Sequence, residues 1–82
     1  MGSVSFDGVS FRIYSEDHEP PHAHGYYGST RTVVRLENPD SVGVRRGSTK
    51  PRNAKQSDVR KIVAMAVEHY SELMEIWEAI HG

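Results

Sequence analysis

The residues best suited to chemistry are three histidines that lie close together beside a pair of prolines. His18, His22 and His24 fall within the run Asp17-His18-Glu19-Pro20-Pro21-His22-Ala23-His24. Side chains alternate along a β-strand, so His22, His24 and Tyr26 share one face if residues 22–27 are extended. The two prolines fix the backbone angle and remove hydrogen-bond donors, which predicts a rigid corner just before that strand.

Two imidazoles on one face support three interpretations. They can act as general acid and base in metal-independent RNA cleavage, with His22 and His24 as the reactive pair and Tyr26 orienting one of them. This chemistry needs no cofactor. Alternatively, His22 and His24 can bind a divalent metal such as zinc, with His18 or Asp17 as a third ligand. The third interpretation is structural, with the rings bonded to backbone around the bend.

The basic residues are concentrated in the middle of the chain. Nine of the ten Lys and Arg residues lie within residues 31–61, although the net charge of the whole chain is −1. A positive segment on an otherwise acidic protein is typical of a surface that binds phosphate groups or an acidic partner. We therefore predict that RNA or a partner protein is bound by the bases of the central loop, which are Arg45, Arg46, Lys50 and Arg52.

The elements that must position these residues follow from hydrophobic periodicity. Alternating apolar residues flank Asp7-Gly8, a favoured hairpin turn, and a second hairpin is predicted about Gly28-Ser29. A short edge strand should follow at residues 42–45, so that all strands lie within residues 3–46. Apolar residues then recur every three or four positions from Val59 to Ile80, which predicts a helix over about residues 54–80. Asn53 and Gln56 form a capping-box pattern at its start.

The fold class predicted from these elements is α+β, with residues 1–82 forming a single domain. An antiparallel sheet of three to five strands should be covered on one face by one long C-terminal helix. The chain contains no cysteine, which excludes disulfides, thiolate zinc sites and a cysteine nucleophile. It also lacks an apolar run long enough for a membrane span and an N-terminal signal peptide, so we expect a cytoplasmic protein.

The chain resembles a prokaryotic family described as domain of unknown function 4160. The resemblance is carried by Tyr14, by Asp17-His18, by Pro20-Pro21-His22-Ala23-His24 and by Tyr26-Tyr27-Gly28. It extends through later landmarks, which are Val42, Gly47, Pro51 and Ile76-Trp77. It implies a small α+β fold and, because relatives are often encoded beside another small protein, a toxin-antitoxin-like module. It implicates His18, His22, His24 and Tyr26 as motif positions only.

Two features depart from that family pattern. Ala23 stands where relatives place an aromatic residue between the last two histidines, and residues 45–52 form a longer and more basic connection than usual. Our first functional hypothesis is a small protein of a toxin-antitoxin-like or mobile-element module. It would bind RNA or a cognate antitoxin-like protein beside the histidine cluster. The alternatives are a divalent-metal-binding domain and a non-catalytic interaction or inhibitor module, in which a homodimer is one arrangement.

Overall fold

The structure is a computed structural model that describes residues 2–82 and begins with two β-hairpins. The first joins β1 (Gly2–Phe6) to β2 (Val9–Ile13), and the second joins β3 (His22–Tyr27) to β4 (Thr30–Arg35). The turns fall at the predicted positions, with Asp7, Gly8 and Gly28 at positive φ. A short 3-10 helix, Pro39–Ser41, precedes the edge strand β5 (Gly43–Val44).

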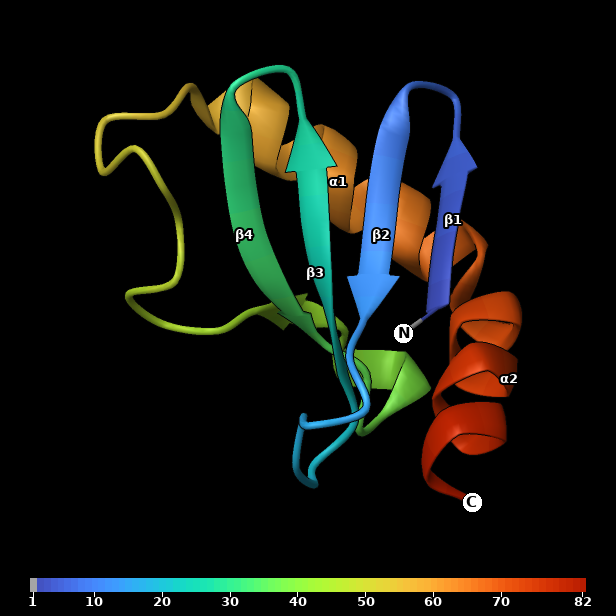
Figure 1. The fold of residues 1–82 in the computed structure, drawn as a ribbon. Helices are drawn as coiled ribbons and strands as arrows, with labels where there is room; N and C mark the ends of the chain where they lie inside the picture. Colours follow the sequence, from blue (N-terminus) through green and yellow to red (C-terminus); the bar gives the residue numbers. More distant parts are fainter. Residues whose placement is uncertain (1) are drawn as a thin grey trace.

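The strands form one antiparallel sheet in which neighbours in sequence are neighbours in space. Its order is β1-β2-β3-β4-β5, which confirms the upper limit of the predicted strand number (Figure 1). In the register of this sheet, His24 lies opposite both Arg12 and Val33, and Tyr26 lies opposite both Ser10 and Arg31. Cross-strand partners point to the same side of a sheet, so this register decides which residues share a face.

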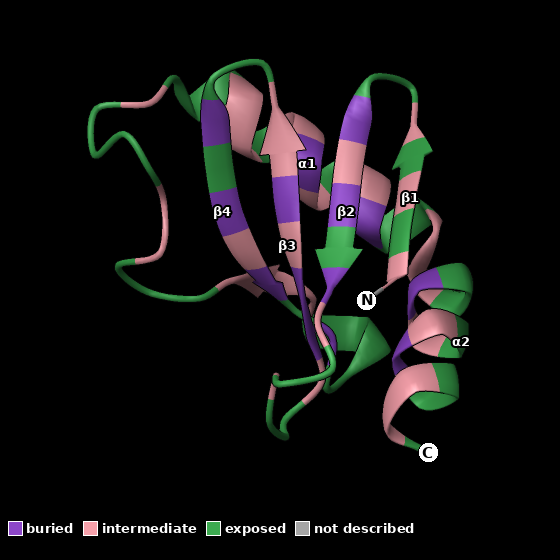
Figure 2. Ribbon diagram, viewed as in Figure 1, coloured by how far each residue is buried: buried purple, intermediate pink, exposed green. Residues whose placement is uncertain are grey.

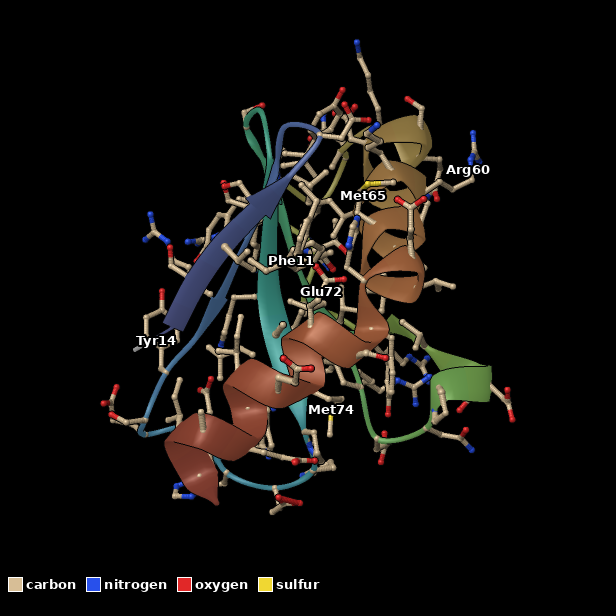
Figure 3. The ribbon with its side chains drawn as sticks, turned by 90° about the vertical axis from the view of Figure 1, so that its right-hand side faces the viewer. Phe11, Tyr14, Arg60, Met65, Glu72 and Met74 are labelled. Carbon is tan, nitrogen blue, oxygen red and sulfur yellow. The ribbon has the colours of Figure 1, made fainter. Side chains whose placement is uncertain are left out.

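Both helices cover the same side of the sheet, as Figures 1 and 3 show from two directions. The helix α1 (Gln56–Glu68) packs against β2, β3 and β4, whereas α2 (Tyr70–His81) packs against β1. Between the layers lies the core, drawn purple in Figure 2. It consists of Val9, Phe11, Ile13, Ala23, Val34, Leu36, Ile62, Ala66, Leu73 and Trp77. The opposite side of the sheet carries no helix in the part of the chain that the structure describes.

The prediction of one long helix was wrong in two details. The helical segment breaks at His69, whose φ of −111° and ψ of 29° lie outside the helical region. The His69 ring stacks on Phe6 at 3.7 Å between centroids, and its nitrogens face the carboxylates of Glu68 and Glu72. The break turns α2 so that Leu73 and Trp77 are buried against the sheet.

The start of the helical segment also differs from the prediction. The helix α1 begins at Gln56 rather than near residue 54, and Lys55 precedes it without a side-chain cap. The capping box expected from Asn53 and Gln56 is therefore not formed. Val67, part of the predicted apolar stripe, is 51% exposed.

Close packing of β3 on α1 fixes the orientation of the histidines. A Cβ atom added to Gly25 would lie 2.5 Å from Cγ2 of Ile62, so only glycine fits between strand and helix. Ala23 and Gly25 therefore face the core, and by alternation His24 and Tyr26 face the open side of the sheet. In the described residues 2–82, no helix is long and apolar enough to cross a membrane.

Candidate functional site

The corner between β2 and β3 holds Asp17 in a defined position. The Tyr14 backbone N–H donates to Oδ2 of Asp17 at 3.1 Å, and the Asp17 backbone N–H donates to the Tyr14 carbonyl at 3.1 Å. Two reciprocal bonds tie the loop into a tight turn and direct the carboxylate toward β3. Asp17 thus lies beside the histidines, with only 16% of its side chain exposed.

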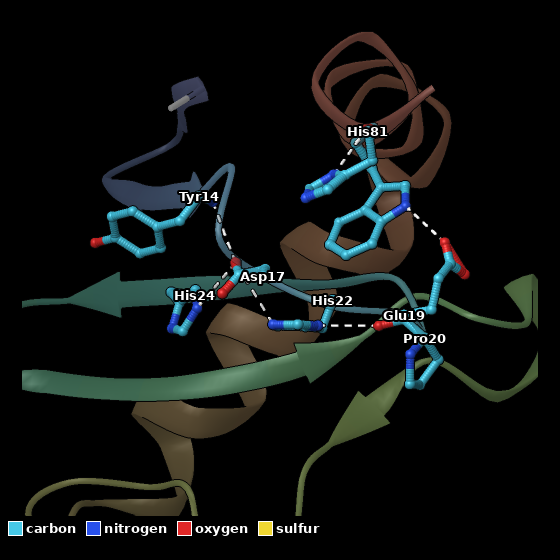
Figure 4. A network of polar contacts seen from close by, with 8 residues as sticks. Tyr14, Asp17, Glu19, Pro20, His22, His24 and His81 are labelled. Atoms are coloured by element: carbon cyan, nitrogen blue, oxygen red, sulfur yellow. Dashed lines mark hydrogen bonds and ion pairs between the residues drawn. The ribbon is translucent and has the colours of Figure 1, made fainter.

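Asp17, His22 and His24 converge on one point (Figure 4). Oδ2 of Asp17 lies 3.5 Å from Nε2 of His22 and 3.3 Å from Nε2 of His24. One ligand atom from each residue lies within 4.8 Å of the other two. The two rings stand edge to face with centroids 5.5 Å apart. The sequence prediction that His22 and His24 share a face is therefore matched by this geometry.

The hydrogen bond on the far side of the His22 ring determines which nitrogen is free. Nδ1 of His22 donates to the Pro20 carbonyl at 3.0 Å, and a carbonyl can only accept. In the neutral ring Nε2 then carries a lone pair, and that lone pair faces the carboxylate of Asp17. Nε2 of His24, close to the same carboxylate, is buried and makes no hydrogen bond. The Nε2 atoms of His22 and His24 thus both face one oxygen of the Asp17 carboxylate.

Trp77 closes the site on the helix side. Its ring centroid lies 5.4 Å from that of His22, and its Nε1 donates to Glu19 at 3.3 Å. The side chain of His22 is only 7% exposed as a result, whereas the side chain of His24 keeps 27% exposure toward the open face. The site thus has a dry side formed by α2 and an accessible side formed by the sheet.

The charge state of Asp17 follows from its surroundings. Burial acts to raise the pKa of this carboxyl, but the Tyr14 backbone N–H and the charges of His22 and His24 outweigh it and lower the pKa below the usual value. Asp17 is therefore an ionised carboxylate at neutral pH. A carboxylate beside two imidazoles is a donor set that binds first-row divalent metals.

The other sequence-predicted residues are distributed unevenly. His18 is exposed and is not one of the converging residues. The sequence allowed either His18 or Asp17 beside His22 and His24, and in the structure the third converging residue is Asp17. Tyr26 makes no hydrogen bond to either imidazole among the described residues, and the ring that meets His24 edge-on is Tyr14, at 5.0 Å. Tyr26 instead lines a hollow beside His24.

The hollow beside His24 brings part of the basic loop to the site. It has a volume of about 260 Å³ and is lined by His24, Tyr26, Arg31, Thr32, Val33, Ser48 and Lys50. The loop is held there because Arg31 and Lys50 exchange backbone hydrogen bonds of 2.9 and 2.8 Å. Arg52 borders a neighbouring hollow that it shares with Lys50. Arg45 and Arg46 are exposed and line neither hollow.

Sequence reasoning missed Arg31 as a member of this group. The signal was present, because a two-residue turn at Gly28-Ser29 pairs Tyr27 with Thr30 and hence Tyr26 with Arg31. Arg12 was also missed, and its guanidinium lies 5.2 Å from the centre of the Tyr26 ring. Both arginines reach the site through sheet register rather than through proximity in sequence.

Comparison with known proteins yields a family assignment. No curated protein and no solved structure matched the chain. One protein-family model matches residues 8–78, which include every strand from β2 onward, the converging residues and both helices except the end of α2. The chain therefore belongs to the family described as Domain of unknown function (DUF4160).

Proposed function

We propose that this protein binds a divalent metal ion through Asp17, His22 and His24. The observation that carries the proposal is the convergence of their ligand atoms. Ligands about 2.1 Å from a common ion at tetrahedral angles lie about 3.4 Å apart. The separations of 3.5 and 3.3 Å between the Asp17 carboxylate and the two imidazole nitrogens match that spacing.

The surrounding hydrogen bonds also suit a metal site. A metal-binding imidazole usually donates its other N–H to a carbonyl or carboxylate, which fixes the ring and its tautomer. The bond from Nδ1 of His22 to the Pro20 carbonyl has this form. A metal ion held there would take one ligand atom from each of Asp17, His22 and His24.

Three protein ligands leave a coordination position open, as in catalytic rather than structural zinc sites. An ion held there would act as a Lewis acid and activate a bound water molecule. The open position would have to be reached from the side of His24, because Trp77 covers His22. The donor set suits zinc and other first-row divalent ions, and it excludes none of them by ligand type.

Zinc titration of tag-free, chelator-treated protein tests this proposal. Calorimetry should show one bound ion per chain, and the fluorescence of Trp77, the only tryptophan, should change as nickel or copper binds beside His22. Asp17→Asn and His24→Ala should each weaken zinc binding by more than about tenfold. His18→Ala is the matched control, because this exposed neighbour is not one of the converging residues.

Two outcomes of the same titration would contradict the proposal. Zinc binding that is lost in His18→Ala but kept in Asp17→Asn would mean that the third ligand is His18. Unchanged calorimetry and fluorescence on addition of zinc, nickel or copper to the folded wild type would reject the proposal altogether. Circular dichroism of each variant shows whether a loss of binding reflects unfolding.

A second candidate, metal-independent RNA cleavage, is favoured by the hollow that joins His24 to Lys50. His22 and His24 would act as acid and base, and Lys50 would stabilise charge on the phosphate. Cleavage of an oligoribonucleotide that persists in excess chelator, with a bell-shaped pH profile, would select this candidate. Cleavage that appears only with added metal would select the first.

Binding of a partner by the basic loop is compatible with either candidate function. In a toxin-antitoxin-like module, RNA or a cognate small protein would bind Arg45, Arg46, Lys50 and Arg52, all of which are exposed. Replacing Arg45 and Arg46 by glutamine should weaken that complex without changing zinc binding, since neither residue lines the hollow beside His24. Equal affinity for the partner in the double variant would remove these two arginines from the interface.

A further inference from the structure

The uncovered side of the sheet carries a set of side chains with one charge sign. Arg12, His24 and Val33 form one row across β2, β3 and β4, Tyr26 and Arg31 belong to the next row, and Arg35 lies opposite His22. All three arginines are exposed. We refer to Arg12, Tyr26, Arg31 and Lys50 as the open-face group.

The cations of the open-face group are not neutralised within the protein. Among residues 2–82, the ion pairs formed by Lys or Arg are limited to one between Lys61 of α1 and Asp7 in the turn between β1 and β2. The five strands contain three arginines and no Asp or Glu. A surface of uncompensated positive charge favours an anionic ligand over an uncharged one.

The aromatic ring of Tyr26 lies among these cations, beside Arg12 and opposite Arg31. Tyr26 is partly exposed, and the guanidinium of Arg12 lies 5.2 Å from the centre of its ring. Single-stranded nucleic acids are bound by surfaces of this kind, because cations follow the phosphates while aromatic side chains stack on the bases. A duplex offers phosphates but keeps its bases stacked, and an acidic peptide offers charge without flat rings.

The hollow beside His24 gives this surface a defined anchor. Arg31 and Lys50 line it from β4 and from the loop, and Tyr26 and His24 line it from β3. A phosphate between Arg31 and Lys50 would place the adjoining nucleotide against Tyr26. The chain would then pass the exposed edge of His24, the accessible side of the candidate metal site.

We propose that the open-face group binds single-stranded nucleic acid, with one phosphate held in the hollow between Arg31 and Lys50 and one base stacked on Tyr26. This inference names the substrate class of the Asp17, His22 and His24 site and rests on the proposed function for that link. The binding itself requires no metal.

Fluorescence anisotropy with labelled oligonucleotides tests the inference in the presence of chelator. The probes are a short oligouridylate, an oligodeoxyuridylate of equal length and a duplex. We expect both single strands to bind more tightly than the duplex, and a preference for oligouridylate would identify the 2′-hydroxyl as recognised. Failure of both single strands to bind, or equal binding of a polyglutamate peptide, would overturn the inference.

Variants assign the binding to the open face. Arg31→Gln and Tyr26→Leu should each weaken single-strand binding by about tenfold. The slope of log affinity against log salt should fall by about one in Arg31→Gln and stay constant in Tyr26→Leu. Arg60→Gln is the matched control, because Arg60 is an exposed arginine on α1, as Figure 3 shows. Equal weakening by Arg60→Gln and Arg31→Gln would refute a specific open-face site.

Zinc calorimetry on the same variants separates the two proposals. Arg31→Gln and Tyr26→Leu should retain wild-type zinc binding, while Asp17→Asn should lose zinc and still bind the oligonucleotide in chelator. Oligonucleotide binding without any zinc binding would support the open-face group and refute the metal site. Zinc binding without oligonucleotide binding would do the reverse.

Discussion

The side chains on the two faces of β3 have different roles. Ala23 and Gly25 point toward α1, where space is so limited that a methyl group at Gly25 would meet Ile62. His24 and Tyr26 point the other way and remain partly exposed. On the covered side, the space beside α1 limits the size of the side chains. The open side carries polar groups that the core does not require. Stability and binding should therefore be separable by residues one position apart.

His22 is the exception that links the two sides. Its register places it on the open face opposite Arg35, but the ring of Trp77 from α2 packs against it and His22 is buried. His69 and His81 show what a structural histidine looks like in this protein. His69 stacks on Phe6 between two carboxylates, and His81 stacks on Trp77 and bonds its carbonyl. Neither belongs to a converging group of ligands in the described residues.

The largest effect should come from the covered side. Phe11 is fully buried, and Phe11→Ala should reduce the free energy of unfolding by about 3–5 kcal/mol, because it removes a large ring and leaves a cavity. Arg12→Ala, one position along β2, should change it by less than about 0.5 kcal/mol. Urea denaturation followed by circular dichroism measures both values. Comparable losses would contradict the separation of the two sides.

Metal binding should stabilise the protein through the open side. At a zinc concentration one hundred times the dissociation constant, the free energy of unfolding should increase by about 2.7 kcal/mol. The gain should disappear in His24→Ala and persist in His18→Ala. Affinity should fall on acidification, because protons compete with the metal for the imidazoles. Melting curves with and without zinc give the comparison, and an equal gain in His24→Ala would contradict it.

Adjacent substitutions on β3 give the sharpest contrast. Gly25→Ala should cost about 1–3 kcal/mol, because the added Cβ would lie 2.5 Å from Ile62 and force α1 away. His24→Ala should cost less in stability and abolish zinc binding. Measuring unfolding and zinc calorimetry on both variants tests the contrast. A destabilised His24→Ala with normal zinc binding would reverse our assignment of the two sides.

Much of the fold could be predicted from the sequence because its signals are local. Alternation at Val9, Phe11 and Ile13 predicted the covered face of β2, and the turn residues Asp7-Gly8 and Gly28-Ser29 predicted both hairpins correctly. The break at His69 gave no such signal. The apolar spacing continues through it, and the break depends on stacking against Phe6, which is distant in sequence.

The candidate site was predictable only in part for the same reason. The spacing of His22 and His24 places both on one face of any strand, so their proximity follows from the sequence. The choice of Asp17 over His18 depends on the Tyr14 backbone bond within an irregular corner, which no periodicity describes. Arg31 follows from hairpin register, whereas the position of Lys50 depends on a long loop returning to β4.

Acidification should remove a smaller contribution to the free energy of unfolding, the one made by ionised Asp17. The folded-state pKa of Asp17 is lowered, with burial opposed by the Tyr14 N–H and the histidine charges. Its contribution to stability is therefore present above the unfolded value of about 3.9 and is lost as the pH falls through the lower folded value. In chelator, Asp17→Asn should be less stable than wild type at neutral pH, with the gap closing in strong acid. A gap that widens in acid would contradict this sign.

The smallest effect on stability is expected at Arg31. Its side chain is exposed and forms no ion pair in the described chain, so Arg31→Gln should leave the free energy of unfolding within about 0.5 kcal/mol of wild type. The backbone bonds that tie residue 31 to Lys50 do not involve the side chain and should survive the substitution. Urea denaturation supplies the measurement. A larger loss would mean that the guanidinium helps to hold the loop in place, and weaker nucleic-acid binding would then reflect a displaced Lys50 rather than a missing phosphate contact.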